Sequence, residues 1–170
     1  MSEAKIFLKA SQAQVLAVVQ DFELEVRGEF VVVSGKQLEP GSLVDAWYIS
    51  SESPLLKTAV ELSSKLSGPV LAMLNWENDL LRLWVFSAGN LLSEYDSNPS
   101  YATCTVTKPE LTHPEAFAQA FGVTERSEAV SKLLARKRGL GFMNETGRFE
   151  LLAKELGIPP EAQLKVQLSD

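Results

Sequence analysis

Four carboxylates flank the turns of a predicted three-strand meander and are the side chains best placed for chemistry. Glu77 and Asp79 follow the first strand of this meander, and Glu94 and Asp96 close the third, predicted at 91–95. Because the middle strand runs backwards, the end of the third strand returns to the end of the first. An acidic corner of this kind can bind a hard cation through oxygen ligands or place two carboxylates for acid–base catalysis.

The same acidic corner has a simpler explanation as turn chemistry. Asp and Asn are common turn residues, and exposed acids in loops are usually solvated. The spacing of the four acids does not match the calcium-binding loop pattern. Glu77, Asp79, Glu94 and Asp96 are therefore candidate metal ligands, and no catalytic residue is assigned.

The chain has one cysteine, Cys104, and one histidine, His113. One thiol cannot form a disulfide within the chain, and one Cys with one His cannot build the usual zinc site. A nucleophilic mechanism would need His113, which precedes a proline beside no obvious nucleophile or orienting acid. Cys104 lies in an apolar–polar alternation and is predicted to be a buried, inert thiol. No cofactor is expected.

Charge is unevenly distributed along the sequence. The formal net charge is −6, yet residues 126–154 contain seven cations and only three acids. Within this window Arg136, Lys137 and Arg138 form a run that could contact phosphate or an acidic partner. The alternative is that these cations stabilise the C-terminal end of a helix. An acidic protein as a whole is a poor nucleic-acid binder.

The predicted strand at 80–86 is apolar on both faces apart from Arg82, with Trp84 and Phe86 beside it. A strand of this kind must be covered on both sides. Helices of the first half can cover one face, and the other needs the C-terminal helices or another subunit. Arg82, Trp84 and Phe86 are therefore candidate partner-binding residues, together with the basic run.

The hydrophobic periodicity and turn signals predict an α+β fold. It has a mainly antiparallel sheet with ferredoxin-like βαββαβ order, a β-meander that extends the sheet, and a C-terminal helical subdomain. One domain spans 1–170, with the sheet and two helices in 1–104, a linker near 105–112 and the helical subdomain in 113–160. Strands are expected at 6–8, 30–33, 43–49, 70–76, 80–86 and 91–95, and helices at 11–22, 53–66, 114–121, 125–137 and 145–156.

Length and composition describe an ordinary globular chain. The 170 residues are 45% hydrophobic and 22% charged, enough for one domain with its own core. No signal peptide is predicted, and no apolar run approaches the roughly 20 residues of a membrane-spanning helix. We expect a cytoplasmic protein with no membrane partner.

Two stretches resemble a pattern found in bacterial proteins of unknown function. The first has an acidic hairpin turn at 78–80, a glycine turn at Gly89 and a Tyr-x-Ser-x-Pro loop at 95–99. The second is the helix ending at 151–159. The resemblance spans roughly residues 70–160. It implies a shared fold with helices packed beside the meander, and it supplies no activity or ligand.

These observations favour a non-catalytic, acidic protein-interaction or regulatory protein of the adaptor or immunity type. Its partner would be another protein or a second copy of itself. The alternatives are a metal-dependent or carboxylate-based enzyme and, less favoured, a protein that contacts nucleic acid through its basic C-terminal helices.

Overall fold

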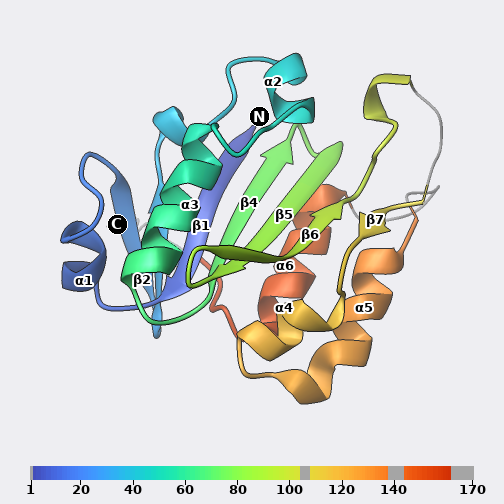
Figure 1. Ribbon diagram of the computed structural model, residues 1–170. Helices are drawn as coiled ribbons and strands as arrows, with labels where there is room; N and C mark the ends of the chain where they lie inside the picture. Colours follow the sequence, from blue (N-terminus) through green and yellow to red (C-terminus); the bar gives the residue numbers. More distant parts are fainter. Residues whose placement is uncertain (1, 104–107, 138–143, 162–170) are drawn as a thin grey trace, which may run out of the picture.

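The computed structural model describes residues 2–103, 108–137 and 144–161. Its centre is one antiparallel sheet with the strand order β2-β3-β1-β4-β5-β6-β7 (Figure 1). The meander predicted from sequence is confirmed as β4, β5 and β6, because short turns join strands that lie side by side. The strands are β1 (Glu3–Lys9), β2 (Glu23–Arg27), β3 (Phe30–Ser34), β4 (Val70–Trp76), β5 (Leu80–Ser87), β6 (Asn90–Asp96) and β7 (Glu110–Leu111).

Helices cover both faces of this sheet. The three helices that precede β4 lie on one face, and the three that follow β7 lie on the other (Figure 1). No helix in the described part of the chain is long and apolar enough to cross a membrane. The helices are α1 (Gln12–Leu16), α2 (Leu43–Trp47), α3 (Pro54–Lys65), α4 (Glu115–Ala120), α5 (Ser127–Ala135) and α6 (Glu145–Glu155), with short 3-10 turns η1 (Lys36–Leu38), η2 (Tyr101–Thr103) and η3 (Thr124–Arg126).

Strand alternation divides the apolar side chains between two cores. On β5, Trp84 and Phe86 face the core beneath α1–α3, whereas Leu81, Leu83 and Val85 face the core beneath α4–α6. The expectation that both faces must be covered is confirmed, and the chain's own helices provide the cover. The second face therefore needs no other subunit.

The strand predicted at 43–49 is wrong, because this segment contains helix α2. Ser42 begins the helix as its N-cap: the Ser42 hydroxyl oxygen accepts the Asp45 backbone N–H at 3.2 Å, and the hydroxyl donates to the Asp45 carboxylate at 2.8 Å. This local capping outweighs the strand preference of the aromatic and β-branched residues that follow.

The first predicted helix is shorter than expected and leaves room for a strand that the sequence analysis missed. Helix α1 begins at the predicted cap, where Ser11 and Gln14 form a reciprocal capping box. It ends at Leu16 rather than near Phe22, and the chain then enters β2.

The predicted linker lies partly in residues 104–107, outside the described part, and its last two residues before Thr112 form β7.

Candidate docking surface

The acidic corner brings two backbone segments together, and Arg82 pairs with one of its carboxylates. Ser97 N–H donates to the Leu81 carbonyl oxygen at 2.9 Å, so the end of β6 lies beside the start of β5. The Asp96 carboxylate lies 3.6 Å from the Arg82 guanidinium, while Glu77 and Glu94 are exposed. Across residues 2–103, 108–137 and 144–161, no three His, Cys, Asp or Glu side chains come together as a metal site.

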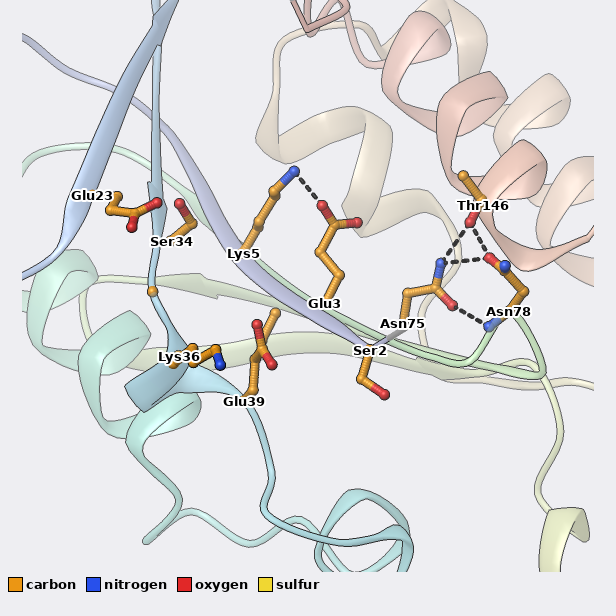
Figure 2. A pocket seen from close by; sticks show the side chains of 12 residues that line it. Ser2, Glu3, Lys5, Glu23, Ser34, Lys36, Glu39, Asn75, Asn78 and Thr146 are labelled. Atoms are coloured by element: carbon orange, nitrogen blue, oxygen red, sulfur yellow. Dashed lines mark hydrogen bonds and ion pairs between the residues drawn. The ribbon is translucent and has the colours of Figure 1, made fainter.

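An amide network ties the turn between β4 and β5 to the start of α6. The buried Asn75 donates from Nδ2 to the Thr146 hydroxyl at 2.9 Å and accepts the Asn78 backbone N–H at 3.2 Å. Thr146 in turn donates to the Asn78 side-chain oxygen (Figure 2). These hydrogen bonds satisfy the Asn75 side-chain amide within the protein, so they hold the β4–β5 turn against the start of α6.

The same network borders a polar cavity of about 430 Å³ at the start of β1. Figure 2 shows Lys5 paired with Glu3 on one side, with Glu23, Lys36 and Glu39 around the opening. Three carboxylates and two ammonium groups nearly balance in charge. The cavity therefore has no strong preference for an anion or a cation.

A larger groove of about 940 Å³ lies between α6 and the sheet. Phe7 and Met73 contribute apolar surface from the strands, and Phe149 adds more from the helix. The Phe7 and Phe149 rings lie 5.2 Å apart. Its cation Arg27 already pairs with Glu25 at 2.8 Å and with Glu161 at 3.9 Å. Lys5, which also lines the groove, pairs with Glu3, so two of the cations at the groove have partners within the chain.

Three titratable side chains lie buried between β6 and α6. The Glu145 and Arg148 side chains are 1% and 3% exposed and form an ion pair of 2.9 Å, and Arg148 also donates to the Leu133 carbonyl oxygen at 2.9 Å. Burial raises the pKa of the neighbouring Tyr95 hydroxyl, and the Arg148 charge partly opposes that increase. Through the Arg148–Leu133 hydrogen bond, this cluster ties α6 to α5 within the second core.

Arg82 connects the centre of the sheet to α2. Its Nη1 donates to the Trp47 backbone carbonyl oxygen at 2.9 Å, and its guanidinium lies 5.0 Å from the Trp84 ring centroid. With Asp96 on its other side, the guanidinium is largely enclosed. Burial raises the pKa of the Asp96 carboxyl, while the Asn98 backbone N–H and the Arg82 charge act to lower it. Arg82, predicted as a partner contact, thus fixes the position of α2.

Helix α2 presents an exposed apolar cluster above the end of β4 (Figure 1). Leu43, Val44 and Tyr48 are 39%, 62% and 69% exposed, and the Tyr48 ring lies 4.8 Å from that of Trp47. Among the described residues, eight large apolar side chains are exposed, and three of them lie within residues 43–48. We call Leu43, Val44, Trp47 and Tyr48 the α2 surface.

The chain around the α2 surface carries only negative charge. Residues 37–56 include Glu39, Asp45 and Glu52 and no Lys, Arg or His. Glu52 pairs with Lys57 just beyond this stretch, which lowers the pKa of the Glu52 carboxyl. Along the sequence, the α2 surface therefore has an acidic surround. In space, the Arg82 guanidinium bonds to the Trp47 carbonyl oxygen and lies 3.6 Å from the Asp96 carboxylate.

The other predicted site residues lie elsewhere. Trp84 and Phe86 are 2% and 5% exposed and belong to the core beneath the first group of helices. Arg136 and Lys137 are exposed after the end of α5, and Arg138, like Cys104, lies outside the described residues. His113 is exposed, with its Nδ1 atom 3.8 Å from the Glu115 carboxylate.

The sequence analysis missed the α2 surface because it treated the segment as a core strand. One signal was available: Ser42 and Asp45 have the Ser-x-x-Asp spacing of a helix start. In a helix, Val44, Trp47 and Tyr48 lie on one side at spacings of three and four residues, whereas in a strand Trp47 and Tyr48 would point to opposite faces of the sheet.

Comparison with protein-family models, with curated proteins and with solved structures finds no match to this chain. The candidate site therefore depends on the geometry alone.

Proposed function

We propose that this chain is a non-catalytic protein-interaction protein, of the adaptor, regulatory or immunity type, and that it docks through the α2 surface. One observation carries the proposal: Leu43, Val44 and Tyr48 are exposed together on one short helix and its C-cap, which a hydrogen bond from Arg82 ties to the sheet. Scattered single apolar residues need no explanation, but a contiguous group often marks an interaction site.

The chemistry of the α2 surface favours a partner with an apolar centre and a basic rim. Tyr and Trp supply much of the binding energy at protein interfaces because they bury a large area with few rotatable bonds. Asp45, exposed within the same helix, favours cations on the partner and speeds its approach.

Two contacts support the α2 surface as a preformed site. The Ser42 cap fixes the start of the helix, and the Arg82 hydrogen bond fixes the carbonyl group of Trp47 near its end. A helix that is already ordered loses less conformational entropy on binding. These two contacts hold a helix of only five residues in place, so that its exposed side chains form a binding surface.

The test places a photo-crosslinking phenylalanine analogue at Tyr48 and, as a control, at Leu92 in β6, which is also an exposed apolar position. In cells of its own host, the proposal expects one protein to crosslink from position 48 and not from position 92. That protein is then purified and its affinity measured. Crosslinks from Leu92 alone, or none from Tyr48, would overturn the assignment.

The matched binding variants are Val44→Ala/Tyr48→Ala and Leu91→Ala/Leu92→Ala, which remove similar exposed apolar groups. The first pair should weaken binding of the purified partner by about 30-fold or more, as for a two-residue hot spot. The second pair should leave binding unchanged. The affinity should also fall as salt rises, because an acidic surround contributes to it.

We further infer that the first half of the chain has the ferredoxin-like arrangement, with β2 as its second strand and β3 as its third strand, in place of the segments 30–33 and 43–49. The strand order β2-β3-β1-β4 and the helices α1 and α3 support this inference. The segment that carries α2 is then an addition between β3 and α3. Additions of this kind on a rigid scaffold commonly carry function.

A further inference from the structure

Strand β2 forms one edge of the sheet. Its described strand neighbour is β3, which it meets in antiparallel register from Glu23 opposite Ser34 to Arg27 opposite Phe30. The other edge strand, β7, has only two residues. Five residues of β2 therefore offer the longer row of backbone groups for pairing with another chain.

The hairpin that joins β2 to β3 determines which backbone groups point outward. Only Gly28 and Glu29 separate the strands, so Arg27 and Phe30 close the hairpin as a hydrogen-bonded pair. Backbone groups alternate from there, so those of Glu25 also face β3. The N–H and C=O groups of Leu24 and Val26 consequently point away from the sheet.

Val26 is the exposed apolar side chain of this edge. It is 57% exposed, whereas Leu24 packs partly against the first core. Glu25 and Arg27 point to the opposite face, where they bond to each other at 2.8 Å. The edge thus combines one apolar residue with an acid and a base placed symmetrically around it.

We propose that β2 pairs with β2 of a second copy of this chain, antiparallel and centred on Val26. In this register Val26 faces Val26 of the other copy and exchanges both backbone hydrogen bonds with it. Glu25 then faces Arg27 of the other copy, and Arg27 faces Glu25, so two opposite-charge pairs form across the two-fold axis. The two sheets become continuous.

Charge complementarity selects this register over the neighbouring one. A two-fold axis through Glu25 would place two carboxylates directly opposite each other, which is unfavourable. With the axis at Val26, Glu25 lies opposite Arg27 of the other copy. The Arg27 guanidinium already meets its own Glu25 at 2.8 Å, Glu161 at 3.9 Å and the Phe7 ring at 5.9 Å, and its five N–H donors allow a further carboxylate from the other copy. The interface is small, so we expect a reversible dimer that strengthens with protein concentration.

This inference is independent of the proposed function, because β2 and the α2 surface are separate parts of the molecule (Figure 1). The first test is disulfide crosslinking of Val26→Cys with Cys104 replaced by Ser. Residues in a hydrogen-bonded antiparallel pair have Cα atoms about 5.5 Å apart, within disulfide range. Mild oxidation should convert Val26→Cys largely to a covalent dimer.

Val44→Cys in the same background is the matched control, because Val44 is equally exposed and lies on the α2 surface. It should remain monomeric under the same oxidation. A dimer through Val44→Cys and not through Val26→Cys would overturn the β2 proposal and place self-association at α2 instead. Equal crosslinking at both positions would show random collision and would also overturn it.

Sedimentation of the protein without added cysteines provides the second test. The wild type should shift from monomer to dimer as concentration rises. Val26→Lys should stay monomeric, because it places two ammonium groups at the two-fold axis, while Val26→Thr should still dimerise. A wild type that remains monomeric at every concentration, or an unaffected Val26→Lys dimer, would overturn the proposal.

Discussion

The Arg82 guanidinium donates to the Trp47 backbone carbonyl oxygen at 2.9 Å and thereby links strand β5 to helix α2 across 35 positions of sequence. The same side chain also meets Asp96 and the Trp84 ring. A charged donor that satisfies a helix-terminal carbonyl stabilises that helix end. The position of the α2 surface therefore depends on a residue that lies inside the sheet.

Replacing Arg82 with Ala should lower the free energy of unfolding by about 2 kcal/mol, since a charge-assisted hydrogen bond is lost. It should also loosen α2, seen as faster hydrogen exchange of the Tyr48 amide, which bonds to the Val44 carbonyl oxygen. Arg136→Ala, at an exposed position, is the control for both measurements. Unchanged exchange in Arg82→Ala would contradict a positioning role.

Breaking the buried ion pair should cost far more than breaking an exposed one. Arg148→Met removes the buried cation of the Glu145–Arg148 pair and its hydrogen bond to the Leu133 carbonyl oxygen, and we expect a loss of about 4 kcal/mol in urea unfolding. Lys132→Met removes one partner of the exposed Lys132–Glu128 pair in α5 and should change stability little. Similar losses in the two variants would refute the distinction drawn from burial.

Tyr95→Phe should be as stable as the wild type or more stable by about 1 kcal/mol. The Tyr95 hydroxyl is buried and has no hydrogen-bond partner among the described residues, so removing it avoids a desolvation cost. Thermal unfolding measures the change, with Tyr95→Leu as a control that also removes the ring and should destabilise. A clearly less stable Tyr95→Phe would mean that the hydroxyl does find a partner.

Asp96 should make the stability depend on pH in an unusual direction for a carboxylate. Its pKa is raised in the folded state, chiefly by burial, so the fold favours its protonated form. Its contribution is most favourable below the unfolded pKa and is lost as pH rises through the raised folded pKa. Urea unfolding across this acidic range should show the wild type losing stability relative to Asp96→Asn as pH rises. The opposite trend would mean that the Arg82 charge outweighs burial.

Local chemistry made several elements predictable. The Ser11–Gln14 capping box marked the start of α1, and turn residues separated β4, β5 and β6. The segment predicted as a strand and found to contain a helix, 43–49, had two conflicting local signals: strand-favouring residues and the Ser42–Asp45 cap. The cap was the stronger signal because it satisfies an otherwise unpaired backbone N–H.

The candidate site was harder to predict than the elements. Carboxylate spacing placed Asp79 and Asp96 at one end of the meander, and their backbones do lie there: the Asn98 amide reaches the Asp79 carbonyl oxygen at 3.5 Å. The spacing of the carboxylates along the sequence could not show that the Asp96 carboxylate would pair with the Arg82 guanidinium. That pairing depends on cross-strand register, where Arg82 lies directly opposite Asp96.

The sequence by itself determined the alternation of β5, and with it the need for cover on both faces of the sheet. It also determined the acidic surround of α2, because residues 37–56 contain no cation. Only the tertiary structure decided that α4–α6 fill the second face, that Trp84 and Phe86 are core, and that the α2 surface is exposed. The physical reason is distance along the chain: hydrogen bonds and periodicity act within a few residues, whereas burial is decided by segments that meet only after the chain has folded.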